Sequence, residues 1–201
     1  MPEFTVNTAK NKIVIEYDSK FIHNSKIKLD KPLFCNMCKE CRNYNKKYSC
    51  PIYAPDFNKL SNKEGILVVI FLCKTANLKS SEYNKVRLAN SIMKSRMEKI
   101  MRHLEEKFNT KFLGTGACRL CKPCKLTLNQ PCKHPDKLRF SLEAVGVDCN
   151  NLSTSLFNKP LLWYKDKKAP DYTCVLSGLI CQNSEIQEIQ KEISLTINSL
   201  Q

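Results

Sequence analysis

The stretch GILVVIFLC, residues 65–73, is an unbroken apolar run that begins at a glycine. Its length and its β-branched residues predict a strand that is buried on both faces. Ser80 or Ser81 is expected to cap a long helix after it. Seven apolar residues at intervals of three and four predict that helix: Val86, Ala89, Met93, Met97, Ile100, Leu104 and Phe108. KFLGTG, residues 111–116, then predicts a strand that runs into a glycine turn, so the order of elements predicts a βαβ unit.

Further elements are expected on both sides of this unit. KIVIEY (12–17) alternates, and PLLWY (160–164) and DYTCVLSGLI (171–180) are apolar, so all three predict strands. A helix is expected from Pro135 to Gly146, because proline suits a first helical position and glycine a helix stop. NLSTSLF (151–157) predicts a shorter helix. A C-terminal helix is expected to pack on the domain through Ile186, Ile189, Ile193, Ile197 and Leu200.

Length and composition predict one domain over residues 1–201, since 201 residues with 42% hydrophobic content can bury a core. The predicted fold class is α/β, with a mixed sheet, the βαβ unit and two cysteine-rich metal-binding loops. No apolar run reaches about 18 residues, so no membrane partner is expected. The first twenty residues lack the order of a secretion signal, and a cytoplasmic location is therefore expected.

Twelve cysteines are the most unusual feature of the composition, and eight of them form two similar sets. Each set contains C-x2-C-x2-C and a fourth cysteine eight or nine residues later. The first set lies in residues 35–51 and consists of Cys35, Cys38, Cys41 and Cys50. The second set lies in residues 114–135 and consists of Cys118, Cys121, Cys124 and Cys132. Disulfides are not expected in a reducing compartment, so the clustering indicates metal.

The spacing favours iron–sulfur clusters as the cofactors. Three thiolates in C-x2-C-x2-C can reach three irons of a cubane, and a similar run with a nearer fourth cysteine is typical of [4Fe–4S] ferredoxins. We therefore expect two [4Fe–4S] clusters; the longer gap to the fourth cysteine leaves ligation across the two sets open. Zinc is the alternative, although zinc sites usually come as two C-x2-C pairs. Radical chemistry with S-adenosylmethionine is not expected, because its usual C-x3-C-x2-C spacing is missing from both sets.

The balance of charge is strongly basic, with 33 Lys and Arg against 19 Asp and Glu, a net charge of +14. Such a balance favours an acidic partner, either an acidic redox protein or nucleic acid, although a solvated lysine-rich surface explains it equally well. Arg119, Lys122 and Lys125 flank the second set and are the candidate partner-binding residues. Cations there would also stabilise a cluster whose net charge with four thiolates is about −2. We expect an acidic redox protein or an anaerobic enzyme as the partner.

Several stretches resemble a known family. GTGACRLCKPC, PCKHPDK and SLEAVGVD look like the motifs of the predicted metal-binding proteins of domain-of-unknown-function family 2284, found mainly in anaerobic bacteria and archaea. CRNYNKKYSCP is similar to the first motif of that family. Asn45 stands where the family usually has glycine, and Ile52 where it has a second proline. The resemblance, over residues 31–180, implies bound iron–sulfur or another metal and supplies no reaction.

The remaining cysteines and histidines carry weaker signals. Cys73, Cys174 and Cys181 lie at strand ends and are expected to be buried apolar residues. Cys149 follows an expected turn and is a candidate spare ligand or redox thiol, although burial is favoured for it too. His134, next to Cys132, is the best candidate for a ligand other than cysteine, but a hydrogen bond at a helix start is favoured.

Three functions remain open at this point. The first is an iron–sulfur protein that transfers electrons or supports an anaerobic redox enzyme. The second is an enzyme in which one iron is left open, with Cys50 and Cys132 as the positions where this would appear. The third is a zinc-stabilised module in which Tyr44, Tyr48 and Tyr53 stack nucleic-acid bases; aromatic packing around the metal is the favoured explanation of these tyrosines.

Overall fold

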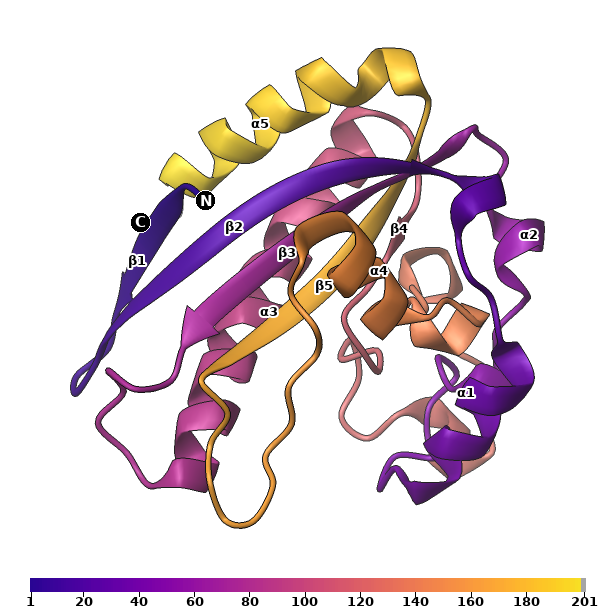
Figure 1. Ribbon diagram of the computed structural model, residues 1–201. Coiled ribbons are helices and arrows are strands. Elements are labelled where there is room, and N and C mark those ends of the chain that lie inside the picture. Colours follow the sequence, from indigo (N-terminus) through magenta and orange to yellow (C-terminus); the bar gives the residue numbers. More distant parts are fainter. Residues whose placement is uncertain (200–201) are drawn as a thin grey trace.

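Five antiparallel strands form the centre of the computed structural model, which describes residues 1–199 (Figure 1). The strands lie in the order β1-β2-β3-β5-β4. Their bounds are β1 (Glu3–Asn7), β2 (Lys12–His23), β3 (Gly65–Lys74), β4 (Phe112–Leu113) and β5 (Tyr172–Cys181). The expected single-domain α/β fold is confirmed. The expected mixed sheet is corrected, since every pair of neighbouring strands is antiparallel.

The predicted βαβ unit consists of β3, the long helix α3 (Glu82–Lys107) and β4, with β5 inserted between the two strands. Both β3 and β4 are antiparallel to β5, so they run parallel to each other. Ser81 occupies the position before the helix, as expected, but its side chain makes no capping hydrogen bond.

Helices cover both faces of the sheet (Figure 1). Alternate residues of β3, such as Leu67 and Phe71, pack with α3 and α5 (Ile186–Ser199) in one apolar cluster. The intervening residues, such as Ile66 and Val68, pack on the other face. There they meet α4 (Cys149–Phe157), α2 (Phe57–Leu60) and the segment around Val145. The prediction of a strand buried on both faces is therefore confirmed.

The predicted helix from Pro135 to Gly146 is wrong. The segment forms two 3-10 turns, Pro135–Lys137 and Glu143–Val145, with extended chain between them. In this conformation the side chain of Arg139 donates to the carbonyls of Asp136 and Leu138 and pairs with Glu105 of α3. Phe140 is held as well, since its carbonyl accepts from the backbone N–H of Gly114 at 2.7 Å. Gly146 does end the second turn, with a left-handed φ of +97°.

The predicted strand over residues 160–164 is also wrong. Trp163 is 76% exposed, and the sheet is already continued on both sides of β5 by β3 and β4. The C-terminal helix is confirmed, with Ile189, Ile193 and Ile197 buried. Leu200 lies outside the described residues. The sequence signals also missed β1.

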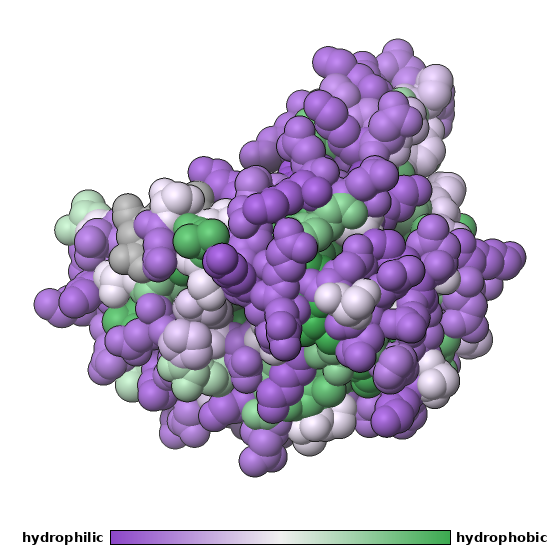
Figure 2. All heavy atoms as spheres, turned by 90° about the horizontal axis from the view of Figure 1, so that it is seen from above, coloured by the Kyte–Doolittle hydropathy of each residue, from purple (hydrophilic) through white to green (hydrophobic). Residues whose placement is uncertain are grey.

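The surface is largely polar. Seen from above, hydrophilic side chains cover most of this face, and hydrophobic ones are visible between them (Figure 2). None of the helices in the described part of the chain combines the length and the apolar character needed to cross a membrane.

Candidate metal centre

The first cysteine set begins on α1 (Lys31–Met37) and continues through irregular chain. Asp30 caps α1 by accepting the backbone N–H of Leu33 at 3.0 Å, and the helix ends just before Cys38. Cys38 opens a 3-10 turn, and Cys50 precedes another that starts at Pro51. The thiols of this set range from exposed at Cys41 to buried at Cys50.

The electrostatic surroundings of Cys38 include the other three cysteines of the first set. Burial raises the pKa of Cys38, and the nearby charges of Cys41, Glu143, Cys35 and Cys50 raise it further. These influences indicate that the other three cysteines of this group lie in the neighbourhood of Cys38. Deprotonation of this group would be favoured by a bound cation, which removes the repulsion between thiolates.

The first loop has asparagine at position 45, where the family it resembles usually has glycine, and the backbone conformation there suits both residues. Its φ is +53°, in the left-handed region that glycine adopts freely and asparagine adopts more readily than other residues. The turn is fixed from outside by Tyr53, whose hydroxyl donates to the Asn45 side chain at 2.6 Å. Within the loop, the N–H of Asn43 donates to Cys41 Sγ at 3.4 Å, and Cys50 Sγ donates to the Asn43 carbonyl at 3.2 Å.

The second set surrounds one small cavity of about 10 Å³, lined by Cys118, Cys121, Cys124 and Cys132. Burial raises the pKa of Cys118, a hydrogen bond from the backbone N–H of Leu120 opposes this rise, and the other three thiols add to it. The second set therefore forms a single group. Soft thiolate ligands select zinc or iron–sulfur clusters, so the chemistry of both sets fits either cofactor.

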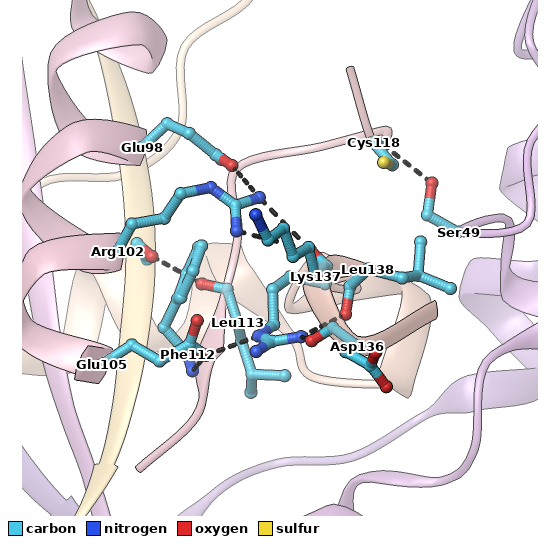
Figure 3. A network of polar contacts seen from close by, with 12 residues as sticks. Ser49, Glu98, Arg102, Glu105, Phe112, Leu113, Cys118, Asp136, Lys137 and Leu138 are labelled. Carbon is cyan, nitrogen blue, oxygen red and sulfur yellow. Dashed lines mark hydrogen bonds and ion pairs between the residues drawn. The ribbon is translucent and has the colours of Figure 1, made fainter. Parts of the chain in front are cut away.

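The two sets are neighbours in space. The hydroxyl of Ser49 accepts the backbone N–H of Cys118 at 2.8 Å (Figure 3), and Tyr48 donates to the carbonyl of Gln130 at 2.7 Å. Lys47 and Tyr48 also line the cavity of the second set. Residues adjacent to Cys50 thus contact the loop of the second set directly.

Helix α3 supports the chain that follows Cys132. Arg102 pairs with Glu98 at 2.5 Å and donates to the carbonyl of Lys137 (Figure 3). Glu105 accepts the backbone N–H of Phe112 at 3.2 Å and also pairs with Arg139. These contacts hold both ends of the second loop on the same helix.

The four cysteines outside the two sets lie on β3, β5 and α4. Burial raises the pKa values of Cys73, Cys174 and Cys181 to about 11; Cys73 and Cys181 are buried as predicted, whereas Cys174 is only half-buried. Cys149 is buried at the start of α4, and burial followed by Glu143 raises its pKa well above the usual value.

His134 lines the cavity of the second set, next to Cys132. Its expected role at a helix start is wrong, because within the described chain its side chain makes no capping bond to the turn that follows. The three predicted partner-binding cations separate: Arg119 and Lys122 line a large cleft, whereas Lys125 lines the cavity of the second set.

Two further charged residues lie near the cysteines: Glu143, which from the sequence was expected near the second set and was explained by a helix face, and Lys94, which the sequence signals missed. Glu143 influences the pKa values of Cys38, Cys149 and Lys94, so it lies among all three. Burial lowers the pKa of Lys94, Arg119 lowers it further, and Glu143 opposes the change. Glu143 lies in the SLEAVGVD motif, whereas Lys94 belongs to no spaced motif and only the three-dimensional arrangement reveals it.

The side chains of the two cysteine sets, all within the described chain, are not arranged around a single metal ion. Among residues 1–199, no three Cys, His, Asp or Glu side chains converge in the arrangement that one metal ion requires. Fold and residues together define a cysteine-rich α/β protein with two sets of four cysteines whose chemistry suits metal.

The comparisons agree with this class. The family described as predicted metal-binding protein (DUF2284) matches residues 20–177, and the chain belongs to that family. No curated protein and no solved structure matches the chain.

Proposed function

We propose that the protein binds two [4Fe–4S] clusters, one in each cysteine set, and transfers electrons. The observation that carries this proposal is that the four cysteines of the second set line one cavity, in a loop joined to the first set by the Ser49–Cys118 hydrogen bond. Although all four are described, no cysteine of the first set lines that cavity, which favours ligation within each set. Two clusters in adjoining loops would allow electrons to pass between them.

Backbone donors add to this support. The N–H of Asn43 donates to Cys41 Sγ at 3.4 Å, and the backbone N–H of Leu120 lowers the pKa of Cys118. Hydrogen bonds to cluster sulfurs, together with nearby positive charge, are among the factors that set the reduction potential of an iron–sulfur centre. Both loops therefore offer the surroundings in which a negatively charged cluster is stable.

The partner proposed for this function is an acidic redox protein. Lys125 and Lys133 border the cavity of the second set, on loops that lie at the surface. Positive charge at this position would guide an acidic partner and increase the rate of encounter.

The partner proposal is tested with the double variant Lys125→Glu and Lys133→Glu. Reduction of the reconstituted protein by an acidic ferredoxin, followed by stopped-flow absorbance at low salt, is expected to slow about tenfold. The control Lys191→Glu changes one exposed cation on the distant helix α5 and should leave the rate unaltered. An unchanged rate in the double variant, with metal content intact, contradicts the proposed docking site.

Zinc is the second candidate, and one observation favours it. The cavity of about 10 Å³ within the second set has roughly the space of a single water-sized atom. Four thiolates around one small space suit a tetrahedral zinc ion, whereas a cubane would require this loop to open. A colourless protein containing zinc and lacking acid-labile sulfide would support this candidate over the first.

The tyrosines of the first loop do not favour nucleic-acid binding. Tyr48 and Tyr53 lie 5.8 Å apart between ring centroids, and both hydroxyls are hydrogen-bonded within the protein. Their interactions support the packing role that was favoured for them over base stacking.

A further inference from the structure

A large cleft lies between helix α3, the turn joining β1 to β2, and the two cysteine-rich segments. Its volume is about 1090 Å³, at the upper end of the usual range for small-molecule sites. Cys118 and Cys121 of the second set form part of its wall. The cleft therefore joins the candidate metal centre to residues far from it in the sequence.

The cleft is lined by many cations. Eight basic residues contribute to its wall: Lys10, Arg42, Lys47, Lys79, Arg87, Lys94, Arg119 and Lys122. Among the described lining residues there is no aspartate and no glutamate. None of the eight forms an ion pair with any carboxylate of residues 1–199, whereas other basic side chains of the protein do form such pairs, for example Lys63 and Lys107. So many uncompensated like charges around one hollow oppose folding unless an anion offsets them.

Lys94 has a special position in this cleft. It is half-buried on α3 and also borders a second cavity, of about 270 Å³, that contains Glu143. Gly116, with a φ of +143°, faces it: a Cβ added at this glycine would stand 3.7 Å from Lys94 Nζ. The chain thus passes Lys94 without a side chain that would cover it, and the ammonium group stays available to the cleft.

The lining also indicates the kind of anion. Asparagine and serine side chains, among them Asn84, Asn90 and Ser91, supply further hydrogen-bonding groups. No aromatic ring is found among the described residues of the wall, so the stacking platforms typical of single-stranded nucleic-acid sites are missing. A concave site also suits a small molecule better than the surface of a folded partner. Three arginines, Arg42, Arg87 and Arg119, match the geometry of phosphate oxygens.

We propose that this cleft binds a phosphorylated small molecule carrying at least three negative charges, next to Cys118 and Cys121. Half of the cations, Lys10, Lys79, Arg87 and Lys94, lie outside the cysteine-rich segments. The inference therefore goes beyond the electron-transfer role and does not depend on which metal the thiols hold.

The test is isothermal titration calorimetry of the metal-loaded full chain with inorganic tripolyphosphate at 150 mM KCl. Saturable binding at one site per chain is expected. Lys94→Met should weaken it about tenfold or more, because a hydrogen bond to a charged group is lost. Since Lys94 is half-buried and its replacement could disturb folding, the exposed pair Lys79→Gln and Arg87→Gln is measured too, with the same expected loss. The matched control, Lys191→Gln on α5, should bind within about twofold of the wild type.

Several results would overturn the inference. Lack of saturable tripolyphosphate binding would do so, as would equal weakening by Lys191→Gln. Equal affinity for citrate would exclude a preference for phosphate. Binding of single-stranded RNA more tightly than tripolyphosphate, lost in the same variants, would assign the cleft to nucleic acid. Calorimetry measures binding without electron transfer, so failure here leaves the proposed function standing, and the reverse also holds.

Discussion

The central sheet and the cysteine-rich segments differ in what holds them together. Strand β3 has nine consecutive buried residues and is paired along its length with β2 and β5. By contrast, no residue from 115 to 135 is buried, all of them being described, and only residues 49–51 are buried within 35–51. The sheet is stabilised by apolar burial, which acts without a ligand. The cysteine segments bury too little to order themselves, so their order must come from hydrogen bonds and from metal.

Metal removal is expected to have the largest effect, because it should loosen the cysteine segments and leave the sheet ordered. In the metal-free protein, amide hydrogen exchange should accelerate strongly in residues 35–51 and 114–135, while β3 and β5 keep their protection. Limited proteolysis should cut first between Phe34 and Pro51 or between Gly116 and Pro135. Equal exchange and equal protease resistance with and without metal would show that the cysteine segments are ordered by the protein alone.

The second prediction concerns the sheet. Phe71 is fully buried and packs edge-on against Phe4, with ring centroids 5.3 Å apart. Phe71→Ala should lower the free energy of unfolding by about 3–5 kcal/mol in urea denaturation, because it leaves a cavity. The control Leu128→Ala removes a side chain that is 49% exposed in the second cysteine segment, and should cost within about 0.5 kcal/mol. A similar loss of unfolding free energy in the two variants would contradict the claim that apolar burial stabilises the sheet more than the cysteine segments.

These two regions were also unequally predictable from sequence. The strand at residues 65–73, the helix α3 and the C-terminal helix follow from local apolar periodicity, which burial then enforces. Spacing predicts the two cysteine sets, and the structure shows the four cysteines of the second lining one cavity. At 135–146, where a helix was expected, the chain is instead held by contacts distant in sequence, from Gly114 to Phe140 and from Glu105 to Arg139. Lys94 and the eight-cation cleft depend wholly on tertiary arrangement, which spacing does not encode.

A glycine at the border of the two regions gives the third prediction. Gly146 has a left-handed φ of +97°, and a Cβ added there would lie 2.8 Å from the Cβ of Lys31. Gly146→Ala should therefore cost more than about 1 kcal/mol in the free energy of unfolding. Gly114→Ala is the matched control, because the nearest atom to its added Cβ is 3.7 Å away. A smaller loss for Gly146→Ala than for this control would contradict the strain argument.

The smallest expected effect lies at the contact between the two cysteine loops. Ser49→Ala removes the acceptor of the Cys118 N–H and should destabilise the metal-loaded protein by about 1 kcal/mol. Release of metal from the second set to a chelator should then be several times faster. Ser155→Ala, at an exposed position of α4, should release metal at the wild-type rate. Identical release from Ser49→Ala would mean that the loops are not coupled through this bond.

The central claim, that each cysteine set holds its own [4Fe–4S] cluster, is tested most directly by metal and sulfide analysis after anaerobic reconstitution. We expect about eight irons and about eight acid-labile sulfides per chain, and an EPR signal of reduced clusters. Cys38→Ser and Cys121→Ser should each retain about half of this iron, because each changes one set alone. Zinc without sulfide, or about four irons in the wild type, would contradict the account.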